Sequence, residues 1–501
     1  MKRVLAVTVA LAGLIVSAAP AGTASPPAQP PLPATGTTLP KPVALPSLPN
    51  FGSSSGLKPF IGHRAHARRL RGFRRPPRNP FMARNGLSNL HNDAYQTNAY
   101  PGAGPSGAKP KLRSAYLQQE CASITFDRRG QIVSVCVGAV GETLDVFQPH
   151  SLHLLATYPL PTEAKVGVGS LTGGATSSTF GGGGYFYLDN QDQAVVATVD
   201  GRIAVLKISH LAHPAITLRK VYNLAPTIGK EAIESALPDW KGNLWFVTTS
   251  GTVGIAKPSG VGARVVRLVT PKHAPSNAGK AEKIGNSFAI DESGGVFVVS
   301  EEAMYRFDAT ANGRPRITWR QRYSRGHRLK PGQVNFGSGT TPTLIHTAHS
   351  RHGGLVAILD NADPSMHVDV FPRGRRGSHR AVCKTAVFTG HKRRNSDENN
   401  VISLGSRIWA ENNYGKAGPI QVTNTVPGMQ EVKIGGPGGC HRVWESDKVR
   451  VPSVVSKVSA RSGLIYSYTH PFQPANGPEA WYVTAVNART GHVVWRRLAG
   501  V

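Results

Sequence analysis

The 501-residue sequence has few acidic residues: 28 Asp and Glu stand against 58 Lys and Arg, which gives a formal net charge of +30 with His neutral. It also lacks the short motifs of several enzyme classes. There is no P-loop, no His-Glu-x-x-His and no Cys-x-x-Cys pair. These absences argue against phosphate-loop nucleotide chemistry and against the usual zinc sites.

Long apolar runs are missing after the first residues of the chain. Lys2 and Arg3 precede an apolar run over residues 4–18, and small residues follow it up to residue 24. This pattern predicts a secretory signal peptide over residues 1–24, since the run is short for a membrane anchor. No transmembrane segment would remain after cleavage, so we expect a protein that is secreted, extracellular or associated with the cell wall.

Residues 25–80 contain little that could build a core. The first part is rich in Pro, Ser, Gly and Thr, and residues 63–78 contain seven arginines and no acid. Such a stretch is typical of a disordered linker that attracts anionic polymers or surfaces, although it could also serve only as a solubilising arm. The candidate anion-binding residues here are Arg68, Arg69, Arg71, Arg74 and Arg75.

A strand-turn-strand pattern recurs over residues 120–501, most clearly from Asn286 to Phe307. The second strand of each repeat is predicted to begin at Ile132, Ala194, Leu244, Val296, Leu355, Ile408 and Leu464. A period of about 55 residues with four short strands predicts an all-β protein, a seven-bladed β-propeller of four-stranded antiparallel blades. Residues 81–119 form a lead-in that we expect to close the ring; eight blades would require more strand from it than its sequence indicates.

The last repeat carries a recognisable motif. Residues 485–495 read Ala-Val-Asn-Ala-Arg-Thr-Gly-His-Val-Val-Trp, which resembles the Ala-x-Asp-x-x-Thr-Gly-x-x-x-Trp repeat of quinoprotein-like propellers. Residues 144–156 resemble the related repeats of secreted surface-layer propellers. The resemblance implies a secreted bacterial propeller and, in its dehydrogenase branch, a quinone cofactor. The adjacent cysteines that such dehydrogenases place against the cofactor are missing, so pyrroloquinoline quinone (PQQ) is not expected.

Only four cysteines are present, and four cysteines in a secreted chain are expected to pair. Cys121 and Cys136 flank a predicted turn at residues 127–130, and a hairpin with 127 opposite 130 places them directly opposite each other. The remaining pair is then Cys383 with Cys440.

Two further basic stretches lie within the repeats. Residues 314–330 carry seven basic residues and residues 373–394 carry eight, without an acid in either. We expect them on outer strands and connections that form a basic rim on one face, with Arg375, Arg376, Arg393 and Arg394 as candidate anion-binding residues. The alternative is a generally basic, soluble exterior.

Propeller ligands usually lie where the inner strands enter the central channel. Counting back ten residues from each second strand gives a column of Ala122, Gly184, Glu234, Asn286, Ile345, Glu398 and Val454. Glu234, Asn286 and Glu398, with Asn399, could supply oxygen ligands to a hard cation such as Ca²⁺. The pattern is similar to the metal ring of gluconolactonase-type propellers. The alternative is that these groups line a water-filled channel.

Three functions are therefore open. The first is a secreted or wall-associated propeller that binds an anionic or small-molecule partner at one face. The second is a Ca²⁺-dependent hydrolase of lactones or esters at the channel mouth, and the third is a quinoprotein-like oxidoreductase. No catalytic residue can be assigned from the sequence.

Overall fold

The computed structural model describes residues 30–36, 56–107, 111–115, 119–138, 141–162, 183–209, 211, 213–272, 277–333, 335–346, 354–415, 425–435, 439–452, 455–470 and 480–500. Residues 33–501 form one compact unit and residues 1–32 belong to another. The following description concerns the unit of residues 33–501.

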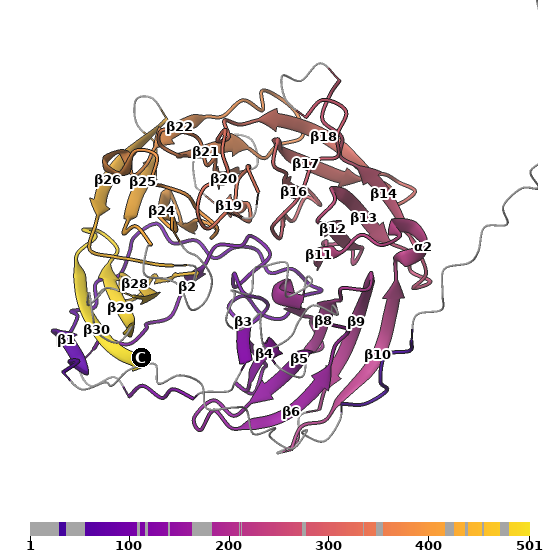
Figure 1. The fold of residues 1–501 in the computed structure, drawn as a ribbon, viewed down its shortest axis with the longest axis horizontal. Coiled ribbons are helices and arrows are strands. Elements are labelled where there is room, and N and C mark those ends of the chain that lie inside the picture. The colour runs from indigo at the N-terminus through magenta and orange to yellow at the C-terminus, as the bar shows by residue number, and fades with distance from the viewer. Residues whose placement is uncertain are drawn as a thin grey trace, which may run out of the picture. The chain divides into compact units, whose positions relative to one another are not determined.

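Seven antiparallel sheets stand side by side in a ring (Figure 1), so the predicted seven-bladed β-propeller is confirmed. Blade 1 contains β3 (Gln119–Phe126), β4 (Ile132–Gly138), β5 (Gly141–Phe147) and β6 (Leu154–Pro159). Blade 2 contains β7 (Tyr187–Leu188), β8 (Gln193–Ala197), β9 (Arg202–Ile208) and β10 (Ile216–Asn223). Blade 3 contains β11 (Ile233–Pro238), β12 (Leu244–Thr248), β13 (Thr252–Ala256) and β14 (Ala263–Arg267).

The remaining blades continue in chain order. Blade 4 contains β15 (Ala289–Ile290), β16 (Val296–Val299), β17 (Ala303–Ala309) and β18 (Pro315–Arg322). Blade 5 contains β19 (Thr343–Ile345), β20 (Leu355–Leu359), β21 (His367–Pro372) and β22 (Cys383–Ala386). Blade 6 contains β23 (Ile402–Leu404), β24 (Arg407–Glu411), β25 (Met429–Ile434) and β26 (Cys440–Ser446). Blade 7 contains β27 (Lys457–Ser459), β28 (Leu464–Thr469), β29 (Trp481–Asn487) and β30 (Val493–Gly500).

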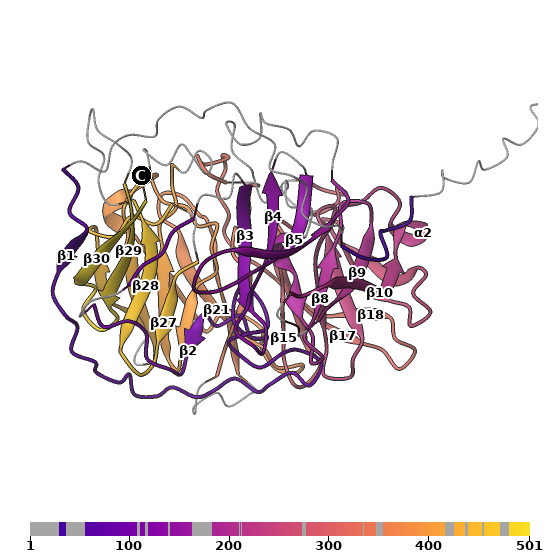
Figure 2. The ribbon, with the colours of Figure 1, turned by 90° about the horizontal axis from the view of Figure 1, so that it is seen from below.

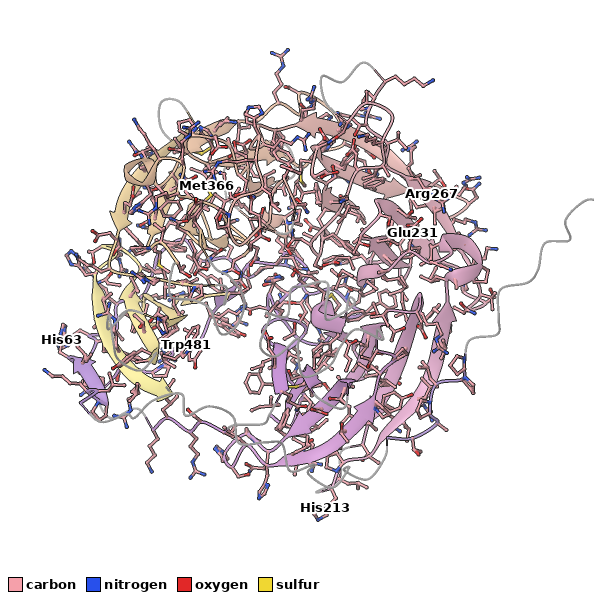
Figure 3. The ribbon with its side chains drawn as sticks, viewed as in Figure 1. His63, His213, Glu231, Arg267, Met366 and Trp481 are labelled. Atoms are coloured by element: carbon pink, nitrogen blue, oxygen red, sulfur yellow. A yellow bond between two sulfur atoms is a disulfide. The ribbon has the colours of Figure 1, made fainter. Side chains whose placement is uncertain are left out.

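How deeply each strand is buried depends on its position in the blade and on the neighbouring blades. All five residues of β12 and of β13 are buried, because both faces of these two middle strands pack against adjacent blades. The outer strand β14 is only partly buried, and its Arg267 lies at the outer edge, 3.4 Å from Glu231 (Figure 3). Met366, by contrast, is fully buried between blades 5 and 6.

One turn repeats at the end of the inner strand in blades 1 to 4. The side chain of an Asp accepts hydrogen bonds from the backbone N–H groups two and four residues further along, and this ties the turn to the next strand. The fourth residue of the turn has a positive φ, which favours Gly. The four acids are Asp127, Asp189, Asp239 and Asp291.

Ring closure joins N-terminal and C-terminal parts of the described chain in blade 7. The C-terminal residues alone supply four strands of blade 7, and two strands from the N-terminal part flank them. β1 (Phe60–Gly62) pairs antiparallel with β30 at the outer edge, and β2 (Ala99–Tyr100) pairs parallel with β27 at the inner edge. The lead-in therefore does contribute a strand, but on the inner side of a blade that is already complete.

Residues 63–78, which we call the arm, were predicted to be disordered, and the structure differs. The backbone N–H groups of Arg68 and Leu70 donate to the carbonyl oxygens of Ser462 and Ala460, at 3.1 and 2.8 Å. Leu70 is buried against blades 6 and 7. Figure 2 shows the segment after β1 running beneath the blades. A few apolar residues, Ala65, Leu70 and Phe73, and backbone hydrogen bonds are thus enough to fix a stretch that looks too polar to fold.

Residues 79–100, which we call the plug, cross the middle of the ring before β2 (Figure 1). Residues 91–99 are all buried. The plug forms a hydrogen bond to every blade, and the partners are Thr125, Leu188, Pro238, Ile290, Leu344, Ser403 and Val458. The plug therefore links all seven blades from inside the ring.

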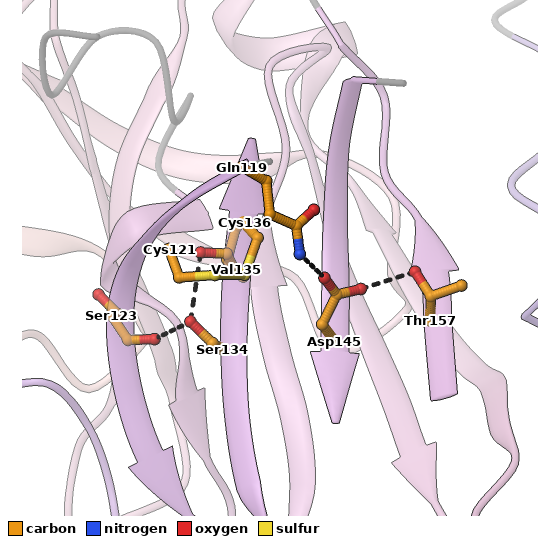
Figure 4. Close-up of a disulfide and its surroundings, with 8 residues drawn as sticks. All are labelled: Gln119, Cys121, Ser123, Ser134, Val135, Cys136, Asp145 and Thr157. Carbon is orange, nitrogen blue, oxygen red and sulfur yellow. Dashed lines mark hydrogen bonds between the residues drawn. A yellow bond between two sulfur atoms is a disulfide. The ribbon is translucent and has the colours of Figure 1, made fainter. Parts of the chain in front are cut away.

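Both predicted disulfides are present: Cys121–Cys136 within blade 1 (Figure 4) and Cys383–Cys440 between the outer strands of blades 5 and 6. The register that led to the first pair needs a correction. The turn closes with Phe126 opposite Ile132, one residue out of the predicted register, and an irregularity between Cys121 and Ser123 restores the alignment of the two cysteines.

Candidate functional site

Tyr185 lies at the centre of the predicted axial site. It ends the short 3₁₀ helix η2 (Gly183–Tyr185) that leads into blade 2. Its hydroxyl donates to Asn286 Oδ1 at 3.2 Å. Burial raises the pKa of Tyr185 well above its usual range, and the nearby Glu234 and Glu398 carboxyl groups raise it further. Three of the four predicted ligands, from blades 3, 4 and 6, are thus brought together around one phenol.

The two carboxyl groups have different surroundings. Glu234 lies in β11 and is buried, and burial raises its pKa to about 8. Glu398 is half-buried and lies against Gly339 of the blade 5 entry, where a Cβ atom would collide with its carboxylate. Glycine at residue 339 therefore allows Glu398 and the neighbouring blade to approach each other.

Asn399, the fourth predicted ligand, is held elsewhere. Its Nδ2 donates to Glu411 Oε2 at 2.8 Å, inside blade 6. Burial raises the pKa of Glu411 to about 7. Within the described parts of the chain, no group of three or more His, Cys, Asp or Glu side chains is arranged to hold a metal ion. A cation here would therefore depend on the two carboxylates together with amide and hydroxyl oxygens.

The rest of the predicted column is less regular. Ile345 lies inside β19 and packs in the core between blades 5 and 6, so it does not face Tyr185. Thr341, four residues earlier, bonds to Tyr185 in its place. Val454 and the side chain of Ala122 lie outside the described residues. Counting back at fixed spacing could not find Thr341, because residues 346–354 separate β19 from β20, a longer connection than residues 239–243 between β11 and β12.

The plug brings further titratable groups to the channel. The ring of His91 lies 6.3 Å from that of Tyr185. The Lys457 ammonium of β27 donates to Asn98 Oδ1 at 2.6 Å and to the Leu90 carbonyl. Burial lowers the pKa of Lys457 to about 7 and raises that of Asp93 to about 6. The repeat pattern of the sequence contained no signal for Lys457.

Arginines gather on the side of the ring that the arm crosses. Arg68, Arg69, Arg71, Arg74 and Arg75 are all exposed, although the backbone that carries them is fixed. Burial lowers the pKa of Arg489, and the charges of Arg68, Arg407 and Arg71 lower it further, which places these guanidinium groups near one another.

The predicted rim arginines do not share one face. Arg375 and Arg376 lie in the connection from β21 to β22, whereas Arg393 and Arg394 follow β22 and so lie at its opposite end. Arg375 is also paired with Asp308 at 2.8 Å. We call the five arm arginines together with Arg375 and Arg376 the basic face, because the turn from β27 to β28 that the arm contacts and the connection from β21 to β22 lie at the same end of their blades. Arg393 and Arg394 do not belong to it.

No family model matches the sequence. An uncharacterised protein of Archaeoglobus fulgidus is 25% identical over 307 residues, which are 56% of this chain and 57% of that protein. The chain thus spans little more than half the length of the curated relative it matches.

Solved structures with a similar fold include a putative 6-phosphogluconolactonase from Bacteroides uniformis (TM-score 0.40, 12% identity, 72% of this chain and 94% of that chain). A periplasmic gluconolactonase from Pseudomonas aeruginosa is similar over 71% of this chain and 90% of that chain, with a TM-score of 0.38 and 11% identity. The Dos1 propeller is similar over 71% of this chain and 79% of that chain, with a TM-score of 0.42 and 9% identity. These similarities concern the propeller fold alone.

No helix in the described part of the chain is long and apolar enough to span a membrane.

Proposed function

We propose that this chain is a secreted or cell-wall-associated binding propeller that attaches to an anionic polymer or surface through its basic face. The observation that carries the proposal is the arm: its arginine side chains are exposed, and hydrogen bonds at residues 68–70 fix its backbone to blade 7. Side chains on a fixed backbone lose less conformational entropy on binding than those of a disordered arm. The two disulfides support an oxidising compartment, in keeping with secretion.

Salt dependence tests this proposal. Binding to a labelled polyphosphate should weaken steeply with salt, because each neutralised phosphate releases a counterion. Replacing Arg68, Arg69, Arg71, Arg74 and Arg75 with Gln should flatten the dependence of log Kd on log salt by several units. The matched control is Arg393→Gln with Arg394→Gln, at the opposite end of β22. An unchanged slope in the five-arginine variant, or an equal loss in the control, would contradict the proposal.

A second candidate function is favoured by the group around Tyr185. Carboxylate and amide oxygens are the ligands that Ca²⁺ prefers, and Glu234, Asn286 and Glu398 supply them from three blades. A cation bound there would polarise a carbonyl group or activate water for opening a lactone or ester.

Thermal unfolding tests this second candidate. Millimolar Ca²⁺ should raise the melting temperature of the wild type relative to chelator, because a ligand of the native state stabilises it by mass action. Glu234→Gln should remove most of that increase, whereas Glu301→Gln, at a buried acid of blade 4, should retain it. Equal melting temperatures of the wild type in Ca²⁺ and in chelator would remove the cation site and the hydrolase function built on it.

A further inference from the structure

A cleft of about 420 Å³ lies between residues 85–104 and blade 7. Leu87, Tyr100, Pro101, Val458 and Tyr466 form most of its apolar wall. Its volume falls within the range of about 300–1,000 Å³ typical of small-molecule sites. Neither the axial group around Tyr185 nor the cysteines contribute to it.

Glycines bring the backbone close to the two tyrosine rings of the cleft. A Cβ atom at Gly86 would lie 3.3 Å from the ring of Tyr100, and one at Gly104 would collide with the ring of Tyr466. Gly86 also has a φ of +94°, which favours glycine. Both rings are only half-buried. The polar lining side chains, Asn85, Lys457 and Ser459, already donate hydrogen bonds to carbonyl oxygens of the chain. The cleft therefore offers a polyol few partners, and its two tyrosines favour a planar ring.

Lys457 lines this cleft, and arginines lie beyond its Tyr466 wall. Tyr466 Oη lies 3.2 Å from Ser462 Oγ, and the Ser462 carbonyl accepts the backbone N–H of Arg68 at 3.1 Å. Arg489 Nη1 in turn donates to the Arg68 carbonyl at 2.9 Å. Arg461, next to Ser462 in the turn from β27 to β28, is exposed. A planar apolar site and a cluster of guanidinium groups are therefore joined through one short turn.

We propose that the cleft binds a base of single-stranded nucleic acid whose phosphates lie on Arg68, Arg461 and Arg489. This combination of stacking aromatic side chains with a positively charged surface is how proteins bind single strands without reading their sequence. A ring-less polyanion would use the arginines and leave the cleft empty, and a duplex keeps its bases stacked in the helix. The inference rests on the proposed function, since Arg68 belongs to the basic face and the single strand would be the anionic partner of that face.

Two labelled 12-nucleotide probes, oligothymidine and its abasic counterpart, separate the contribution of the bases from that of the phosphates. In fluorescence anisotropy at fixed salt, the wild type should bind oligothymidine about tenfold more tightly than the abasic strand, as expected for one stacked base. Ala103 is exposed and lines the cleft. Ala103→Trp should fill the cleft and abolish the preference without changing the affinity for the abasic strand, whereas Ala103→Ser should retain both.

A second measurement does not depend on a variant. Photocrosslinking of an oligomer containing 5-iodouracil to the wild type should label the peptide of Tyr100 or that of Tyr466. Equal affinity of the wild type for both strands would overturn the nucleobase site and leave the polyanion function standing. A preference that survives Ala103→Trp, or crosslinks only elsewhere, would overturn the assignment to this cleft. Binding of neither strand at low salt would overturn the inference together with the proposed function.

Discussion

Asp93 shows how a single buried residue holds the plug in the ring. Its Oδ1 accepts the backbone N–H groups of Tyr95 and Thr97, at 3.0 and 3.2 Å, and its Oδ2 accepts the Thr97 hydroxyl at 2.6 Å. The carboxyl group thereby shapes the backbone that reaches blades 4 to 6. Burial nevertheless raises its pKa to about 6, because these hydrogen bonds only partly replace the water that the carboxylate loses.

This shift predicts a pH dependence of stability. The unfolded chain releases the Asp93 proton near pH 3.9, whereas the folded protein keeps it to about pH 6. Protonation of Asp93 therefore stabilises the folded state relative to the unfolded chain. This stabilisation is fully present below the unfolded pKa, and it is lost as the pH rises through 6, by up to about 1.4 kcal/mol per pH unit. Asp93→Asn cannot ionise, so its free energy of unfolding should fall less than that of the wild type between pH 4 and 6.5.

Urea unfolding at several pH values measures the free energies of unfolding of Asp93→Asn and of the wild type. Asp447→Asn is the matched control, because Asp447 is exposed and forms a surface ion pair with its neighbour Lys448. The control should follow the wild type. Parallel curves for Asp93→Asn and the wild type would contradict the predicted protonation of Asp93 in the folded protein.

At the scale of elements, the sequence predicts what repeats and misses what occurs once. The second strands begin at the predicted residues or within one residue of them, since Val, Ile and Phe alternate there and turn residues delimit each strand. The irregularity between Cys121 and Ser123 and the long connection from β19 to β20 have no repeated counterpart. These local shifts are decided by packing between blades, and they move residues such as Thr341 into the axial group.

The two disulfides predict different losses of stability. Cys121 and Cys136 are 15 residues apart on paired strands, whereas Cys383 and Cys440 are 57 residues apart and join two blades. A longer closed loop restricts the unfolded chain more, which gives about 3 kcal/mol for the first bridge and about 4 kcal/mol for the second. In urea unfolding, the double variant Cys383→Ala/Cys440→Ala should therefore lose more stability than Cys121→Ala/Cys136→Ala. The reverse order would show that native contacts, not loop length, set the contribution of each bridge.

At the scale of the whole molecule, the N-terminal part both holds the blades of the ring together and carries exposed charge. β1 and β2 flank blade 7, and the plug bonds to all seven blades. Composition alone predicted a disordered linker up to residue 80, since it counts arginines but not the backbone groups that bind the ring. The predicted attraction to polyanions depends only on the exposed guanidinium groups, and it does not require the arm to be disordered.

Stability and binding should therefore separate along the arm. Leu70 is 1% exposed and packs with Ala99 and Val458, so Leu70→Ala should cost about 2–5 kcal/mol of unfolding free energy. The affinity of the folded Leu70→Ala protein for polyphosphate should stay close to that of the wild type, because no charge is lost.

The five-arginine variant should behave in the opposite way, with an unchanged melting temperature and weak binding. Deleting residues 25–80 should impair both, since it removes β1, Leu70 and the arginines together. Urea unfolding and polyphosphate titration of the three variants decide the matter: a deletion variant as stable as the wild type would show that the arm is only a charged tail.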